Sequence, residues 1–321
     1  MKNLLFFLTT LLIILNSCNH IELADEIPGD QVDVTIIFDW EGIDDAAPEE
    51  MSVHFFRTTK RSVRPYIYDF HDLNGGTIKL PPGIYSAICY NSDSDNHTLI
   101  GQNSFYDFGI RLGDYNDNGL LNQFPSLKPS IDEERIAHAP DKMWISSIES
   151  LEIGKDTNTS IVIRFKMIPI VNKYKFIIHH PINYTDAFSI LGVVTGMTST
   201  IHPGVFQTGN ETVSHTFIFE KNNNGELIGE LLTFGHCTNQ AMKSEPSEDS
   251  ELHSLRIHAV WKNGKNWVSS HDITSQIHNE NNSSHIIEID TVTFPNHSQG
   301  SEGGFNPSVG GWTGNTEFIG M

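Results

Sequence analysis

The chain has 321 residues, with 40 acidic and 20 basic side chains, which gives a formal net charge of −20 at pH 7. A surface this acidic repels phosphate backbones, so we expect no nucleic-acid partner. Domains usually run to about 100–200 residues, so this length predicts two of them.

The first residues have the pattern of an export signal. Lys2 precedes an apolar run from Leu4 to Leu15, which is too short to cross a bilayer because a spanning helix needs about 20 apolar residues. The run ends in Leu15-Asn16-Ser17-Cys18, which resembles the lipobox of bacterial lipoproteins. The resemblance implies that residues 1–17 are a lipoprotein signal peptide and that Cys18 carries the lipid. The alternative is an ordinary secretory signal followed by a chance cysteine.

Residues 18–30 are acidic and contain Pro28-Gly29, so we expect a flexible tether. Each buried methylene of an attached chain adds about 0.8 kcal/mol of membrane affinity. Two or three chains, such as palmitate, on Cys18 would hold the protein permanently. The expected location is the cell outer membrane, with the protein exposed at the surface.

The remaining sequence has the alternation of β-strands. Apolar and polar residues alternate with period two in four clear segments: Val32–Trp40, Met51–Phe55, Lys173–Ile178 and Leu255–Trp261. Turn sequences such as Asn74-Gly75 and Asn224-Gly225 separate such runs. Because we find no helices of ten or more residues between them, the pattern predicts an all-β chain of antiparallel sandwiches.

A domain boundary is predicted close to Pro169. Residues 161–167 look like a closing strand and residues 173–178 like an opening one, and proline interrupts a shared ladder. This divides the chain into an N-terminal β-sandwich at 31–168 and a C-terminal one at 169–321.

Several short segments, taken in order, resemble a family of Bacteroidetes surface lipoproteins related to the fimbrillins. The resembling segments are Asp39-Trp40, Met51–Phe56, Leu80–Tyr85 with Asn91 beyond it, Leu191–Met197, Leu232–Gly235 and Gly303–Trp312. The resemblance implies two transthyretin-like sandwiches behind a lipid anchor. Fimbrillins of this superfamily are trimmed by an arginine-specific protease and polymerise by donating a strand to a neighbouring subunit. Here no Lys or Arg lies between Cys18 and Asp39, which argues against a processed shaft subunit and favours either a subunit that keeps its anchor or a protein outside any fimbria.

The best metal candidate is a calcium loop. Asp114, Asn116 and Asn118 occupy places one, three and five of an EF-hand-type loop, with Gly119 at place six. Place twelve, which needs a carboxylate, is Pro125. A polar turn is therefore the alternative.

Histidine and cysteine offer no recognisable catalytic or metal motif. The 16 histidines lack the spacings of a zinc site, so we expect them to be scattered and mostly exposed. With Cys18 lipidated, Cys89 and Cys237 remain, either as a disulfide or as two separate buried thiols, which their separation favours. We expect the protein to have no enzymatic activity and to bind no cofactor.

Two functions remain open. The first is a structural or adhesive surface lipoprotein of fimbrillin-like type, an anchor or accessory subunit of a fimbrium. Its partners would be other fimbrial subunits, or a host or bacterial surface protein. The alternative is a glycan-binding lipoprotein of a polysaccharide-uptake system, in which Trp261 and Trp267 stack on sugars. For each tryptophan, a place in the core is the favoured alternative.

Overall fold

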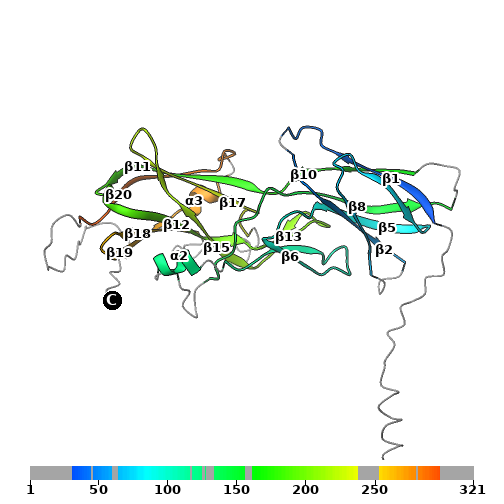
Figure 1. Ribbon diagram of the computed structural model, residues 1–321, viewed down its shortest axis with the longest axis horizontal. Coiled ribbons are helices and arrows are strands. Elements are labelled where there is room, and N and C mark those ends of the chain that lie inside the picture. Colours follow the sequence, from blue (N-terminus) through cyan, green and yellow to red (C-terminus); the bar gives the residue numbers. More distant parts are fainter. Residues whose placement is uncertain are drawn as a thin grey trace, which may run out of the picture.

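The computed structural model describes residues 31–44, 46–59, 64–115, 118–124, 127, 134–155, 161–237, 253–279 and 281–296. The predicted signal peptide and tether, with Cys18, lie outside these residues. The described chain forms two β-sheet bodies that lie end to end along the long axis (Figure 1). Within the described residues, no helix is long and apolar enough to cross a membrane.

The first body is a sandwich of two sheets. One sheet has the order β4 (Gly76–Leu80), β1 (Val32–Asp39), β9 (Ile161–Lys166). The other has the order β10 (Ile168–Pro169), β8 (Trp144–Ile153), β5 (Gly83–Asn91), β2 (Met51–Arg57), β3 (Tyr66–Phe70). Side chains from both sheets share one buried core, which includes Ile36, Phe55 and Phe165.

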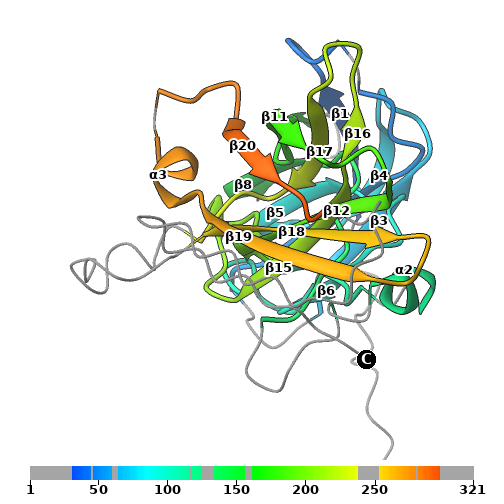
Figure 2. The same cartoon turned by 90° about the vertical axis from the view of Figure 1, so that its left-hand side faces the viewer.

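The second body is also a sandwich, seen from its end in Figure 2. One sheet has the order β16 (Glu220–Lys221), β17 (Leu227–Thr233), β11 (Asn172–Ile182), β20 (Ile286–Thr293). The other has the order β15 (Thr212–Ile218), β12 (Ala187–Thr198), β18 (Ser254–Trp261), β19 (Asn266–Asp272). Phe176 and Leu255 are among the buried residues that join these two sheets.

The two sandwiches repeat one strand order. The sheet β4-β1-β9 corresponds to β17-β11-β20, and β3-β2-β5-β8 corresponds to β15-β12-β18-β19. In each sandwich the first strand lies between an antiparallel neighbour and a parallel last strand: β1 pairs with β4 and β9, and β11 with β17 and β20. The predicted all-β fold of two transthyretin-like sandwiches in tandem is confirmed.

A third, smaller sheet joins the two bodies, and we call it the junction sheet. Its order is β14 (Gln207–Thr208), β13 (Thr200–His202), β7 (Gly109–Leu112), β6 (His97–Ile100). β6 and β7 come from the connection between β5 and β8 of the first sandwich, whereas β13 and β14 come from the connection between β12 and β15 of the second. The hydrogen-bonded pair Ile201–Ile110 therefore crosses from one half of the chain to the other.

The junction sheet covers the outer face of β2 and β5. Phe56, Ile88 and Tyr90 on that face pack in one cluster with Phe108 and Ile110. This explains why every residue of β2 from Met51 to Phe56 is buried, because a strand with both faces covered has no solvent side.

An arm from the first half, made of the described residues 113–115, 118–124, 127 and 134–137, reaches the second sandwich. Its short helix α2 (Asn118–Gln123) is followed by Phe124 and Leu127, which pack on Leu191 and Val260 of the outer face of β12 and β18. A domain boundary near Pro169 stays a prediction. The connection between β5 and β8 contacts the second half, and the connection between β12 and β15 contacts the first half.

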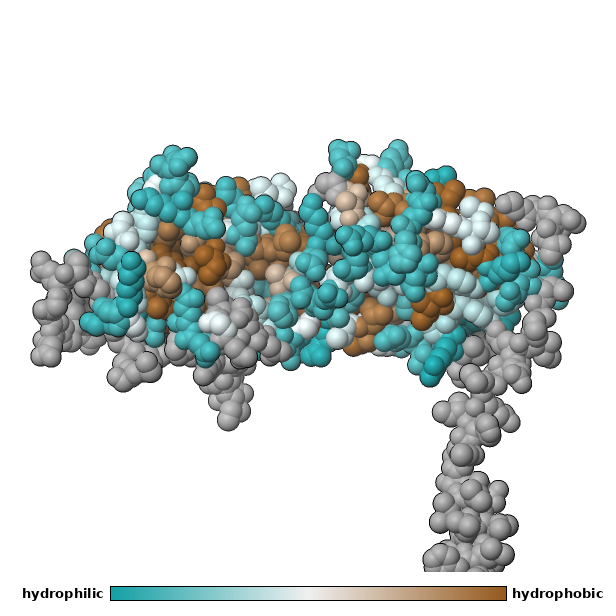
Figure 3. All heavy atoms as spheres, viewed as in Figure 1, coloured by the Kyte–Doolittle hydropathy of each residue, from teal (hydrophilic) through white to brown (hydrophobic). Residues whose placement is uncertain are grey.

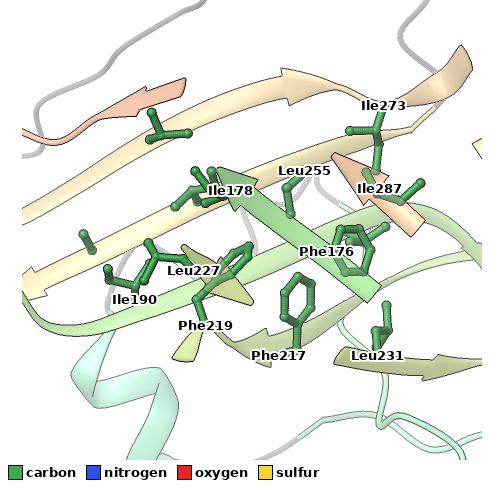
Figure 4. Close-up of a cluster of buried hydrophobic side chains, with 14 of the residues drawn as sticks. Phe176, Ile178, Ile190, Phe217, Phe219, Leu227, Leu231, Leu255, Ile273 and Ile287 are labelled. Atoms are coloured by element: carbon green, nitrogen blue, oxygen red, sulfur yellow. The ribbon is translucent and has the colours of Figure 1, made fainter. Parts of the chain in front are cut away.

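Phe217 lies among the buried side chains of the second core (Figure 4), in a space that two glycines leave. Its ring is stacked on Phe176 at a centroid distance of 4.6 Å. A Cβ atom on Gly192 of its own sheet, or on Gly229 of the facing sheet, would collide with this ring. The glycines therefore let an aromatic ring lie between the sheets at normal packing density.

We expect Gly229→Ala to lower the free energy of unfolding by about 1–3 kcal/mol, because the added methyl overpacks the core. Gly154→Ala is the matched control, since a Cβ there meets nothing within 4 Å. Urea unfolding measured by tryptophan fluorescence checks both. Adding Phe217→Leu to Gly229→Ala should restore part of the loss, and equal stability of the two glycine variants would contradict this packing.

Candidate functional site

The first candidate feature is β1 itself. Val32, Val34, Ile36 and Phe38 point into the first core and are at most 4% exposed. Five residue pairs join β1 to β4 and six join it to β9. Both edges of β1 are thus paired, and the first sandwich is complete with a strand of its own chain.

The second candidate feature is the contact between the arm and β15. Ala137 N donates to Ser214 O at 2.9 Å, and Ser214 N donates to Arg135 O at 2.9 Å. The arm thereby adds a short parallel bridge to the outer edge of β15, where an unpaired strand edge would otherwise remain.

Side chains reinforce this contact. The Glu134 carboxylate accepts hydrogen bonds from Gly196 N and from Ser214 Oγ, each at 2.9 Å. His215 is fully buried, and its Nδ1 lies 3.1 Å from the carbonyl oxygen of Ala137. Burial lowers the pKa of His215 to about 4, so the ring is neutral at pH 7 and Nδ1–H donates to that carbonyl.

A network of ion pairs lies at the solvent-exposed side of the junction sheet and links the two halves of the chain. Arg111 binds Glu211 through two nitrogens, at 2.7 and 2.9 Å. Arg135 Nε lies 3.0 Å from the same carboxylate, and its Nη1 lies 2.6 Å from Asp114. Hydrogen bonds from Arg111, followed by those from Arg135 and Ser199, lower the pKa of Glu211 to about 2. Since both arginines belong to the first half and Glu211 to the second, the network fastens the halves together.

The calcium candidate has a different partner in the structure. Asp114 is the carboxylate that pairs with Arg135. Asn116 lies outside the described residues, and Asn118 is the first residue of α2. No group of three or more His, Cys, Asp or Glu side chains among the described residues forms a metal site. The calcium loop therefore stays a prediction.

The two tryptophans proposed to bind a glycan are core residues. Trp261 is 4% exposed and Trp267 is 6% exposed, and Trp267 packs against Phe294 at a centroid distance of 5.0 Å. Stacking on a sugar needs an open ring face, so this interpretation of Trp261 and Trp267 is wrong. The polar–apolar alternation of a strand cannot tell a buried tryptophan from an exposed one when both faces of the sheet are covered.

The predicted burial is right for the two cysteines and wrong for the histidines. Cys89 and Cys237 are both free and buried, as the favoured alternative predicted, and burial raises the pKa of each thiol. The expectation of mostly exposed histidines is wrong, because among the described histidines only His71 and His180 are exposed. The sequence also gave no sign that Glu134 and Glu211 would contact residues far along the chain.

Residues 17–219 match the family described as "Domain of unknown function (DUF5119)". The chain belongs to this family. The match covers the first sandwich, the junction sheet and the beginning of the second sandwich. A homologous curated protein from Bacteroides ovatus, "Putative fimbrium anchoring subunit Fim4B", is 27% identical over 167 residues, which is 51% of this chain and 45% of that protein. The matched segment is thus less than half of that relative.

One solved structure supports the same fold. A "putative adhesin" from Bacteroides ovatus superposes with a TM-score of 0.60 at 19% identity, covering 87% of this chain and 98% of that one. The fimbrial anchor protein Mfa2 from Porphyromonas gingivalis is more distant, with a TM-score of 0.48 at 11% identity over 82% of this chain and 90% of that one. The homology to the Bacteroides ovatus protein described above confirms the predicted relation to fimbrillin-like proteins.

The low pKa of Glu211 predicts how the junction responds to acid. A carboxyl group whose pKa is lowered by folding stabilises the protein above its ordinary pKa of about 4.5, and this contribution disappears as the pH falls towards about 2. Glu211→Gln should lose about 1 kcal/mol at pH 6, because a half-exposed bidentate network contributes modestly. The difference from the unmodified protein should shrink at pH 3.

Urea unfolding at pH 6 and pH 3 measures this difference. Glu230→Gln is the control, because Glu230 pairs with Lys173 on an exposed face. An unchanged gap between Glu211→Gln and the unmodified protein at both pH values would contradict the assigned role of Glu211.

Proposed function

We propose that this chain is a non-enzymatic surface lipoprotein that serves as an anchoring or accessory subunit of a fimbrium. The observation that carries the proposal is the homology to a protein named as a fimbrium anchoring subunit, at 27% identity over 167 residues.

The position of β1 supports the anchoring role over that of a shaft subunit. A subunit that accepts a strand from a neighbour needs an open place in its sheet, because an added strand binds through unpaired main-chain groups. In the first sandwich β1 already fills the place between β4 and β9. The absence of Lys and Arg between Cys18 and Asp39 removes the cleavage points at which a trypsin-like or arginine-specific protease would release this strand.

Anchoring itself is proposed to depend on lipid at Cys18. The motif Leu15-Asn16-Ser17-Cys18 is the support, and the acidic segment 18–30 would hold the sandwiches away from an outer-membrane surface. Partner subunits would bind the exposed sandwich surfaces. Figure 3 shows apolar side chains among polar ones on both bodies, and Tyr106 and Phe206 beside the junction sheet are 56% and 50% exposed.

The anchor is tested by replacing the thiol. In a Cys18→Ala variant, the chain should leave the membrane fraction and lose incorporation of a labelled fatty acid, because no lipid can be attached. Cys89→Ala is the matched control, since that thiol is buried in the first core. Fractionation and fatty-acid labelling of cells that make each variant provide the measurement. Continued labelling of Cys18→Ala would contradict lipid attachment at this residue.

The fimbrial role is tested separately. Mass spectrometry of sheared surface appendages should find this chain at a low ratio to the shaft subunit, because an anchor or accessory subunit is present once or a few times per fibre. Deletion of the chain should release fibres into the medium, and consistent absence of the chain from purified appendages would refute the role.

A further inference from the structure

Three histidines from separate segments meet at one end of the second sandwich, and we call them the histidine cluster. His236 follows β17, His253 precedes β18, and His278 follows the short helix α3 (Thr274–Ile277). Their ring centroids are 4.6 Å apart for His236 and His278, 5.0 Å for His253 and His278, and 5.8 Å for His236 and His253. None of these contacts belongs to the junction or to β1.

His253 is held in one tautomer. It is 3% exposed, and its Nδ1 lies 3.1 Å from the carbonyl oxygen of Thr195. A carbonyl only accepts hydrogen bonds, so Nδ1 carries the hydrogen and Nε2 of the neutral ring presents its lone pair. Backbone carbonyls orient metal-binding histidines in this same way.

The lone pair of His253 faces a second imidazole. Nε2 of His253 and Nε2 of His278 are 3.0 Å apart, and without a metal the His278 Nε2–H donates to His253. The neutral imidazole is the form of histidine that binds metal ions.

We propose that the histidine cluster binds one divalent transition-metal ion of the zinc type, through Nε2 of His253 and Nε2 of His278 and with His236 as a third ligand. Two nitrogens that are each 2.0–2.1 Å from a tetrahedral ion lie about 3.3 Å apart. The observed 3.0 Å needs only a small separation of the rings. His278 binds after its hydrogen moves from Nε2 to Nδ1.

The third ligand requires a side-chain movement. No three side chains already converge on one metal position among the described residues, so His236 turns towards the pair on binding. His236 is half-buried, and its ring centroid is 4.6 Å from that of His278. A set of three neutral imidazoles favours zinc, copper or nickel over calcium or magnesium, which prefer oxygen ligands.

The bound ion would connect three segments that the backbone joins only weakly. His236 lies in an isolated bridge to Met197, and α3 is a single short turn of four residues. A metal ion at this point would fix the end of β17, the beginning of β18 and the end of α3 relative to one another. The second sandwich should therefore unfold at a higher temperature with zinc than without it.

Zinc alone, added to the mature chain from which metal has been removed, tests the proposal. Isothermal titration should find one ion per chain, and cobalt in its place should give the intense visible absorption of a tetrahedral nitrogen site. The His253→Gln, His278→Gln double variant should bind at least tenfold more weakly. His179→Gln, His180→Gln is the control, because these adjacent histidines pair with carboxylates on another part of the sandwich.

Single variants keep the test decisive if the double variant folds poorly. His278→Gln changes only a half-buried ring, and it should abolish the zinc-dependent rise in unfolding temperature while leaving the circular dichroism spectrum unchanged. Failure of the unmodified chain to bind one zinc ion would overturn the proposal. So would equal binding by the control pair and by a folded His278→Gln variant.

Discussion

The pairing of β1 on both of its edges is the constraint on which the rest of the molecule depends. β1 joins an antiparallel strand to a parallel one, and its four inward side chains complete the first core. Parallel neighbours cannot be linked by a tight turn. The other strands of the first sandwich, except β10, therefore lie between β1 and β9 along the chain. Loss of β1 would open the core and separate β4 from β9.

The two sandwiches are joined by more than a linker. The junction sheet takes two strands from each half, the arm covers the outer face of β12 and β18, and Glu211 binds two arginines of the other half. These contacts combine hydrophobic burial with hydrogen bonds and charge, so they resist bending in more than one direction. An anchor at the base of a fibre transmits force from the fibre to the membrane, and a rigid connection of this kind suits that role.

The sequence predicted the strands and their tandem arrangement because alternation and turn residues are local signals. β1 and β11 were anticipated from Val32–Trp40 and Lys173–Ile178, and β9 from the run before Pro169. The junction sheet was not, since its strands are short and Ile110 pairs with Ile201 about ninety positions away. The same reason hid the histidine cluster, because His236, His253 and His278 have no motif spacing. The burial of Trp261 and Trp267 agrees with the favoured core alternative, which alternation alone could not establish because it does not reveal that a second layer covers a sheet.

We infer that the mature protein keeps β1 and is held by lipid at Cys18. Intact-mass spectrometry of the protein extracted from cell membranes tests this most directly, because it measures the N-terminus and its modification together. The expected mass is that of one species that begins at Cys18, carries attached acyl chains and includes β1. A species that begins beyond Asp39, or one that begins at residue 18 without lipid, would contradict it.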